Sequence, residues 1–414
     1  MQTYTARVVD GMLAERLEVV AAVLIEGPKA CGKTETALRQ AQSVVRFDVD
    51  QDARQAAEID PQLVLSGDQP RLLDEWQLFP QLWDHVRRAA DDRQGNGQFL
   101  LTGSATPADE VRRHSGAGRI ATIRMRPMTL YELGASSGEV SLAAMFDGRE
   151  PSATRGIAGL ADTLELLVAG GWPGQLERPD PRFASEYLRQ VAEVDVNAVM
   201  PGEAPRRRDP QKVMACIRSL ARNVATAAGE RTIAADANLS RDAVRGYLAA
   251  LSRLMLVEDQ PAFNVHLRSS RNLRQTPRRH LVDPSLAAAA IDRGVDGLLA
   301  DLNYTGLLVE SLVVRDLRVL AQPLGGTVTY FHTDDHEIDV VIERQDGTWG
   351  AIEVKLGGEE AIDHGASSLL AAVASIDHTK AGPPAFTAVV TAVGRYAHRR
   401  GDGVFVIPLS TLGP

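Results

Sequence analysis

Apolar and polar residues alternate along the first 130 residues in the pattern of strands separated by helices. The run VVAAVLIE, residues 19–26, predicts a buried parallel strand, because strands covered on both faces are apolar throughout. Helical stretches and further apolar runs of this region lie at 33–42, 44–50, 63–65, 71–73, 80–90 and 98–102. Strands that alternate with helices predict an α/β parallel sheet.

The pattern becomes helical from about residue 134 to 205 and again over 211–228. The segment TIAADANLSRDAVRGYLAALSRLMLVED, residues 232–259, then predicts a helix, a tight turn, a helix and a strand. Ser240 is the expected N-cap, and one apolar face consists of Val244, Tyr247, Leu248 and Leu251. This is the pattern of a winged helix-turn-helix, although a plain helical hairpin has the same pattern.

The last part of the chain, from about residue 280, predicts a second α/β unit. Its helices are expected at 306–321 and 361–376, and its strands at 326–331, 337–343, 349–356, 385–391 and 403–407.

Composition narrows the class of protein. A chain of 414 residues is expected to form about two to four domains, and 44% hydrophobic with 24% charged residues is typical of globular proteins. A net charge of −9 argues against a protein that coats nucleic acid, but it leaves room for local basic patches. Two cysteines, Cys31 and Cys216, make no disulfide framework, which fits a reducing compartment.

No apolar run approaches the roughly 20 residues that span a bilayer, and the first residues have no apolar segment of a secretory signal. We therefore expect a cytoplasmic protein without a membrane partner.

The stretch GPKACGKT, residues 27–34, matches the P-loop pattern G-x-x-x-x-G-K-[ST] between a predicted strand and helix. Glycines let the backbone N–H groups surround phosphates, Lys33 places a cation near the β- and γ-phosphates, and Thr34 ligates magnesium. We therefore predict ATP and Mg²⁺ as ligands, and a turn without ligand is the lesser interpretation. The predicted nucleotide-binding residues are Gly27, Pro28, Lys29, Ala30, Cys31, Gly32, Lys33, Thr34, Glu35 and Asp74.

Two further strand ends carry polar groups after the P-loop. In RLLDEW, Asp74 is expected to hold magnesium, and Glu75 to orient the attacking water. In FLLTGSA, Thr102 and Ser104 close a strand. A hydroxyl at this strand end is expected to bond the γ-phosphate or the attacking water, and the alternative is a polar strand terminus without a ligand. Arg119, in HSGAGRI, is the candidate arginine finger.

These stretches occur in a distinctive order, with VLIEGPKACGKTETA first and then LLDEWQLFPQLWDHVRRAADD, GQFLLTGSATP and GAGRI. In this order they resemble the bacterial and archaeal AAA-type ATPases that carry a C-terminal domain of unknown function related to restriction endonucleases. PMTLYELG, GGWPG, LVDPSLAAAAI and GLLVESLVVRDL extend the resemblance to about residues 5–410. It implies an ATPase core, a helical lid, a winged helix and a PD-(D/E)xK nuclease-like domain.

In the same way, the resemblance implies phosphate and magnesium binding by Lys33 and Thr34. It makes Asp74 the acid that holds the metal and Glu75 the acid that orients the attacking water. Ser104 would be the sensor and Arg119 the finger. The expected domains are the core 1–133, the lid or linker 134–205, the winged helix 206–268, a basic linker 269–279 and the nuclease-like domain 280–414.

The stretch EIDVVIERQDGTWGAIEVKLG, residues 337–357, has the pattern of that nuclease-like site. Such domains place an acid on one strand and E-x-K on the next, so that two carboxylates hold magnesium and the lysine orients the attacking water. Strand alternation puts Glu353 and Lys355 on one face. Asp339 supplies the first acid.

The register of the hairpin decides whether Asp339 reaches that face. A two-residue turn at 346–347 would place it opposite Val354, and a five-residue loop at 344–348 would place it opposite Glu353. The metal-site interpretation thus requires the longer loop or a bulge. Glu310, in the preceding helix, is a candidate fourth member or a solvated helical residue. The alternative for the whole site is an inactive nuclease-like domain used for binding.

Arginines gather in two places of this acidic chain, and we expect them to contact DNA phosphates. The residues are Arg206, Arg207 and Arg208, then Arg268, Arg271, Arg274, Arg278 and Arg279. Arg241 and Arg245 lie one turn apart on the predicted recognition helix, where they could reach the major groove. Linkers and salt-bridged faces remain the alternative.

Three functional hypotheses follow. The first is an ATPase that couples nucleotide state to nucleic-acid binding or phosphodiester cleavage. The second is an ATP-regulated DNA- or protein-binding module with an inactive nuclease-like domain, and the third is an interaction switch without nucleic acid. A homo-oligomer is expected if Arg119 acts on a neighbouring copy.

Overall fold

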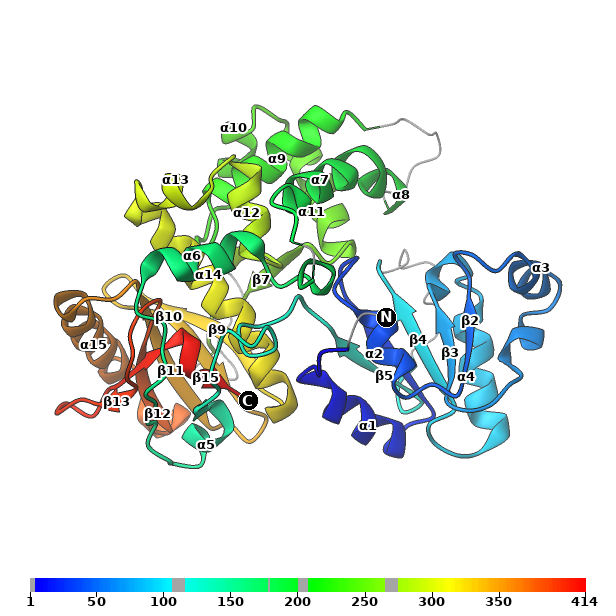
Figure 1. Ribbon diagram of the computed structural model, residues 1–414, viewed down its shortest axis with the longest axis horizontal. Helices are drawn as coiled ribbons and strands as arrows, with labels where there is room; N and C mark the ends of the chain where they lie inside the picture. The colour runs from blue at the N-terminus through cyan, green and yellow to red at the C-terminus, as the bar shows by residue number, and fades with distance from the viewer. Residues whose placement is uncertain (1–3, 106–115, 178, 200–207, 265–274) are drawn as a thin grey trace.

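The structure is a computed structural model that describes residues 4–105, 116–177, 179–199, 208–264 and 275–414. It contains one β-sheet near the N-terminus, a second near the C-terminus, and an assembly of helices from the middle of the chain that lies above both in Figure 1. Five arginines of the predicted DNA-binding surface lie outside the described residues, namely Arg206, Arg207, Arg268, Arg271 and Arg274.

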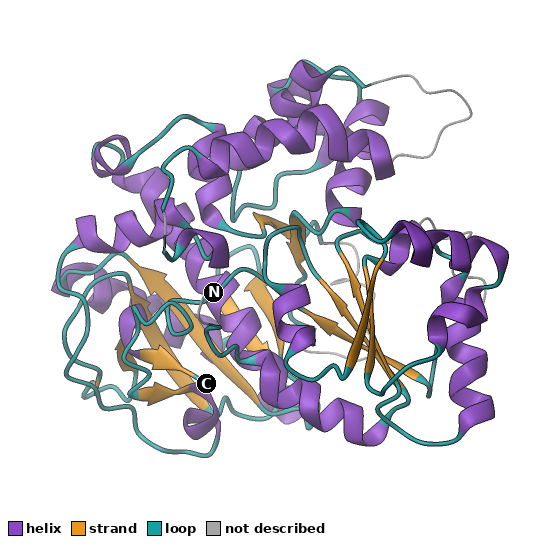
Figure 2. Ribbon diagram, turned by 45° about the vertical axis from the view of Figure 1, so that its right-hand side comes forward, coloured by secondary structure: helices purple, strands orange, loops and turns teal. Residues whose placement is uncertain are grey.

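The first sheet is entirely parallel, with strand order β2-β3-β4-β1-β5. Its strands are β1 (Ala22–Glu26), β2 (Ser43–Arg46), β3 (Arg71–Asp74), β4 (Phe99–Gly103) and β5 (Ile120–Arg124). Its helices are α1 (Val9–Val19), α2 (Lys33–Leu38), α3 (Gln51–Ile59) and α4 (Leu82–Arg93). The twisted sheet between helices is visible in Figure 2. The predicted parallel α/β core is thus confirmed.

One apolar run of this region is not a strand. Residues Pro61–Leu65 form a 3₁₀ helix, with proline in its first turn and the Asp60 side chain accepting a hydrogen bond from the Gln62 N–H. Proline fits the first turn of a helix and Asp caps it, so these local signals outweigh the apolar pattern.

Helices α6 to α11 form the middle of the chain, and the two-stranded β7–β8 ribbon follows them. Their bounds are α6 (Leu160–Ala169), α7 (Phe183–Gln190), α8 (Val196–Val199), α9 (Pro210–Arg222), α10 (Glu230–Asp236), α11 (Arg241–Arg253), β7 (Val257–Gln260) and β8 (Arg278–Leu281). Ser240 caps α11 as expected, because its side chain accepts a hydrogen bond from the Ala243 N–H. The expected order of helix, turn, helix and strand is present, and its identity as a winged helix stays a prediction.

The second sheet is mixed, with strand order β13-β14-β12-β11-β10-β9. Strands β9, β10 and β11 pair antiparallel, and β11, β12 and β14 pair parallel. The elements are α12 (Pro284–Ala290), α13 (Val295–Leu299), α14 (Leu302–Ala321), β9 (Thr327–His332), β10 (Glu337–Glu343), β11 (Trp349–Lys355), α15 (Glu359–Ala374), α16 (His378–Ala381), β12 (Phe386–Thr391), β13 (His398–Arg399) and β14 (Phe405–Pro408).

Residues 136–157 pack against this second sheet, although we expected them in a helical lid. Strand β6 (Val140–Ser141) pairs with β15 (Leu412–Gly413), and α5 (Leu142–Phe146) follows directly. The Ile157 carbonyl accepts a hydrogen bond from the Gly394 N–H. This part of the predicted lid therefore belongs spatially to the C-terminal half.

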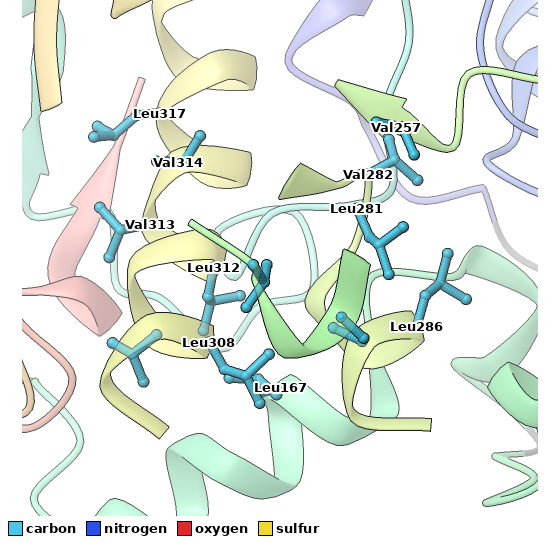
Figure 3. Close-up of a cluster of buried hydrophobic side chains, with 14 of the residues drawn as sticks. Leu167, Val257, Leu281, Val282, Leu286, Leu308, Leu312, Val313, Val314 and Leu317 are labelled. Carbon is cyan, nitrogen blue, oxygen red and sulfur yellow. The ribbon is translucent and has the colours of Figure 1, made fainter. Parts of the chain in front are cut away.

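The helical assembly and the second sheet share one hydrophobic core, part of which is drawn in Figure 3. Leu308 and Leu312 of α14 contribute to it together with Leu167 of α6, Leu281 of β8 and Leu286 of α12. The first sheet packs on separate apolar clusters. Because α14 is buried on most sides, the polar residues that it carries are placed inside the protein. Among the described helices, α14 included, none has the length and apolarity that a membrane span requires.

Candidate nucleotide site and C-terminal carboxylate cluster

The P-loop connects the end of β1 to the start of α2, and two of its glycines are required by geometry. A Cβ on Gly27 would lie 2.2 Å from the Met125 carbonyl oxygen. Gly32 has φ +100°, a left-handed conformation that side chains rarely adopt. This backbone leaves α2 to begin at Lys33, with its first N–H groups at the carboxyl edge of the sheet, where anions bind.

The two polar residues at the start of α2 have partners within the site. The Lys33 ammonium is buried and donates a hydrogen bond to the Pro28 carbonyl across 2.8 Å. The Thr34 hydroxyl donates to Asp74 Oδ1 across 2.8 Å, and Thr102 donates to the same oxygen. Hydroxyl and carboxylate oxygens are the ligands that Mg²⁺ prefers, so Thr34 and Asp74 suit this ion.

Glu75 lies beside this pair, at the end of β3, with φ +56°. Its carboxylate accepts a hydrogen bond from the Ser104 hydroxyl across 3.0 Å and another from the Gln77 amide. Ser104 thus approaches Glu75, which agrees with the position expected for both. The sequence analysis did not single out Gln77. Its position two residues after Glu75 was the only sequence feature that could have indicated this contact.

Arg119 lies at the opposite edge of the same sheet. Its carbonyl accepts a hydrogen bond from the Ala22 N–H at the beginning of β1, whereas the P-loop follows Glu26 at the end of that strand. The two strand ends are roughly 13 Å apart. The Arg119 side chain is half exposed and pairs with Asp91 across 2.6 Å. Within one chain it is therefore remote from the P-loop, and only a neighbouring copy could receive it as a finger.

The helical assembly contacts the P-loop through Lys29, a residue to which the motif assigns no chemistry. Its ammonium pairs with Asp195 across 2.6 Å, and its carbonyl accepts a hydrogen bond from the Tyr187 hydroxyl across 3.3 Å. Asp195 ends a single π-helical turn, Val191–Asp195, and such turns are frequent at functional sites. The side chain of Asp195 is 6% exposed, whereas that of Lys29 is 48% exposed.

Glu258 joins the first sheet to the rest of the protein. Its carboxylate pairs with Arg124 at 3.0 Å, with Arg126 at 2.9 Å and with Arg318 of α14 at 3.1 Å. Burial by itself would raise the pKa of Glu258, but the charges of Arg126, Arg318 and Arg124 outweigh burial and lower this pKa below its ordinary range. The carboxylate is therefore ionised and holds three arginines together.

The C-terminal hairpin has the register that the metal-site interpretation requires. Val340 pairs with Ile352, and the loop comprises residues 344–348. The same register places Asp339 opposite Glu353, and the Asp339 carboxylate accepts a hydrogen bond from the Val354 N–H across 2.9 Å. The Lys355 ammonium pairs with Glu353 Oε1 at 2.7 Å.

The guanidinium of Arg278, from β8, lies among these carboxylates. It pairs with Glu310 of α14 at 2.6 Å, approaches Asp339 to 3.5 Å and also pairs with Glu337. Glu310 is 8% exposed, so its interpretation as a solvated helical residue is wrong. Arg278 is 6% exposed and directed into the protein, not towards a phosphate at the surface. We name Arg278, Glu310, Glu337, Asp339, Glu353 and Lys355 the carboxylate cluster.

The carboxylate cluster holds more acidic than basic groups, and this excess raises the pKa of two of its carboxyl groups. Burial, and then repulsion by Asp339, raise the pKa of Glu310 well above its ordinary value. The same two causes raise the pKa of Glu353 to about 7, although Lys355 opposes them. Across the described parts of the chain, no three His, Cys, Asp or Glu side chains are arranged as ligands of a metal ion. As it stands, the cluster surrounds a guanidinium and does not fit a metal ion.

Three further arginines of the predicted DNA surface, Arg241, Arg245 and Arg279, have acidic partners. Arg241 and Arg245 of α11 both approach Glu230, at 3.9 and 3.2 Å, while more than half of each side chain stays exposed. Arg279 pairs with Asp259 at 3.4 Å and donates to the Ala228 carbonyl. This is the salt-bridged arrangement named above as the alternative to phosphate contact.

Comparison with protein families divides the chain into three parts. Residues 20–134 match a family described as an AAA domain, residues 160–296 a domain of unknown function (DUF8612), and residues 305–412 a domain of unknown function (DUF4143). No curated protein matches the chain. The relation of the last part to restriction endonucleases therefore stays a prediction. The match over residues 20–134 supports an AAA-type P-loop domain, and the P-loop and the parallel sheet of this region agree with it.

Proposed function

We propose that this chain is a magnesium-dependent ATPase. The contact between Thr34 and Asp74 carries the proposal, because it brings a hydroxyl and a carboxylate together beside the P-loop. These two residues would hold Mg²⁺, which neutralises phosphate charge when it is bound. Lys33, which is bonded to the Pro28 carbonyl without nucleotide, would turn to the phosphates of ATP.

Glu75 and Ser104 provide the remaining chemistry. The Glu75 carboxylate lies beside the Thr34–Asp74 pair, where it would orient the attacking water and accept its proton. The Ser104 hydroxyl keeps this carboxylate in place and would also contact the γ-phosphate. Both roles agree with their positions at the carboxyl ends of β3 and β4.

The test is ATP turnover by the purified chain with and without Mg²⁺. Lys33→Ala should lower the rate by about 100-fold or more, because one charged group that stabilises the transition state is lost. Lys212→Ala, an exposed lysine on α9, is the matched control and should leave the rate unchanged. Absence of magnesium-dependent turnover, both with and without DNA, would contradict the proposal.

A second candidate function is phosphodiester cleavage by the C-terminal domain, coupled to the nucleotide state. The position of Asp339 opposite Glu353, with Lys355 on the same strand, favours it. The competing proposal is a domain that binds DNA or a protein without cleaving. A Glu353→Gln/Lys355→Ala double variant that stops Mg²⁺-dependent cleavage of DNA supports the first, and DNA binding without cleavage by the wild type supports the second. Absence of any salt-dependent DNA binding would point to an interaction switch without nucleic acid.

A further inference from the structure

Arg7 lies inside the protein, just before α1, and joins the P-loop to the segment after β5. Helix α1 packs on β1 and β5 (Figure 1). The side chain of Arg7 is 3% exposed. Its Nη1 atom donates a hydrogen bond to the Cys31 carbonyl across 2.8 Å, and its Nη2 atom donates to the Arg126 carbonyl across 2.8 Å. A residue that precedes the matched part 20–134 therefore contacts the middle of the P-loop.

Glu132 neutralises this buried guanidinium and fixes its position. The Oε1 atom of Glu132 accepts hydrogen bonds from Arg7 Nε across 3.0 Å and from the Val8 N–H across 2.8 Å. The Oε2 atom accepts two more from the backbone N–H and the hydroxyl of Thr129. The Glu132 side chain is 1% exposed. Because withdrawal of Arg7 would leave this buried carboxylate without its counter-charge, the guanidinium is held against the P-loop.

The P-loop has an unfavourable backbone on both sides of the carbonyl that Arg7 contacts. Ala30 has φ +62° and Gly32 has φ +100°, so two left-handed residues flank Cys31. The left-handed region is unfavourable for a residue with a side chain, and such a conformation persists only where surrounding contacts hold it. An added Cβ on Gly32 would lie 3.3 Å from Arg7 Nη1, so the guanidinium packs directly on the loop. Arg7 is thus one of the contacts that maintain this backbone.

The contact also fixes the direction of one backbone N–H group. The Cys31 carbonyl and the Gly32 N–H belong to one trans peptide unit, in which the C=O and N–H bonds point in opposite directions. A carbonyl that points at Arg7 therefore directs the Gly32 N–H to the other side of the loop. Backbone N–H groups of a Gly-rich loop and of the helix start that follows it are the groups that bind phosphates.

We propose that Arg7 is a positioning residue of the nucleotide site, and that it holds the Cys31–Gly32 peptide with its N–H directed to the phosphates of ATP. The proposal rests on the proposed function, because it takes ATP as the ligand of the P-loop. Arg7 acts through the backbone of the loop and not through its own charge, since Glu132 neutralises that charge.

ATP binding by Arg7→Met/Glu132→Gln tests the proposal. This double variant removes the contact with the loop and both charges, so no buried charge is left unpaired. Equilibrium titration of the full chain with ATP and Mg²⁺ should give a Kd about tenfold higher than that of the wild type, because a hydrogen bond from a charged donor no longer holds the loop. In steady state KM for ATP should rise by a similar factor while kcat changes less than about twofold, since Arg7 serves binding and not the chemical step.

Two controls separate the position of the loop from overall stability. Arg16→Met makes the same change at an exposed position of α1 and should bind ATP like the wild type. Val86→Ala removes buried apolar volume from the cluster of the first sheet that does not contain Cys31. It should lower the Tm and leave the Kd for ATP unchanged. Circular dichroism checks the fold of every variant.

A second variant serves if the double variant fails to fold. Arg7→Lys keeps a cation beside Glu132, but its single nitrogen cannot take the places of Nε, Nη1 and Nη2 together. The variant should therefore also bind ATP more weakly than the wild type, with kcat unchanged.

The outcomes distinguish this inference from the function on which it rests. Wild-type ATP affinity in the folded Arg7 variants would overturn the positioning role and leave ATP binding intact. An equal rise of the Kd in Val86→Ala would overturn it as well, because affinity would then follow stability. So would a fall of kcat at constant KM, which would assign Arg7 to the chemical step.

ATP binding without turnover by the wild type would contradict the ATPase, while the comparison of Kd values would still decide the role of Arg7. Absence of ATP binding by the wild type would overturn both the proposed function and the positioning role.

Discussion

Arg126, just after β5, donates a hydrogen bond to the Glu258 carboxylate across 2.9 Å and so joins the N-terminal parallel sheet to the β7–β8 ribbon. Arg318 of α14 reaches the same carboxylate from the C-terminal half. One buried glutamate therefore connects three parts of the chain that are distant in sequence.

Glu258→Gln should lower the free energy of unfolding by about 3–5 kcal/mol, because buried arginines lose their counter-charge. Urea denaturation measures the change. Asp259→Asn is the matched control, since its side chain is 48% exposed and forms a longer ion pair, at 3.4 Å, with Arg279. The control should cost less than about 1 kcal/mol. A cost for Glu258→Gln no larger than that of the control would show that the three-arginine contact contributes no stability.

Gln77→Ala should lower kcat for ATP about tenfold and leave KM unchanged, because the amide holds the Glu75 carboxylate but lies outside the P-loop. Steady-state kinetics separate the two parameters. Gln62→Ala, an exposed glutamine of the 3₁₀ helix after α3, should change neither. A higher KM at constant kcat would mean that Gln77 serves nucleotide binding and does not position Glu75.

Asp195→Asn should tighten ATP binding by about two- to fivefold, because Lys29 is released from a half-exposed ion pair and gains freedom to approach the phosphates. Equilibrium titration with a fluorescent ATP analogue measures the Kd. Asp180→Asn removes an exposed pair with Arg182 and should have no effect on the Kd. Weaker ATP binding by Asp195→Asn would instead make the carboxylate part of the nucleotide site.

His280 should make the protein less stable in acid. Burial, and then the charges of Arg318 and Arg278, lower its pKa well below the ordinary 6.5. The unfolded chain binds a proton at this residue near pH 6.5 and the folded chain does not, so the free energy of unfolding falls as the pH drops below 6.5. The slope is at most about 1.4 kcal/mol per pH unit for one such group.

His280→Gln should remove this contribution. The free energy of unfolding of the variant should therefore change less between pH 7.5 and pH 5 than that of the wild type. These two pH values lie about one unit or more on either side of 6.5. The exposed His364 on α15 supplies the control, and His364→Gln should keep the wild-type slope. Parallel curves for wild type and His280→Gln would show that the buried imidazole accepts a proton in the folded state.

Local sequence signals determined the P-loop and parallel sheet of the N-terminal part and the beginning of α11. The P-loop is recognisable because glycines and Lys33 must stand at fixed positions between a strand and a helix. Ser240 is recognisable as an N-cap because the first turn of a helix needs a side-chain oxygen before it. For Asp339, the sequence allowed two registers, and only the pairing of Val340 with Ile352 selected the one opposite Glu353.

The tertiary structure alone decided which charges meet. In the sequence, Arg278 is one of a run of basic residues. In the structure, packing of the β7–β8 ribbon on β9 and β10 directs its side chain towards the carboxylate cluster. The same packing makes Glu258 the partner of Arg126 and Arg318. Contacts of this kind depend on burial of whole elements, which sets the energy of each charge, and no local pattern of residues encodes that burial.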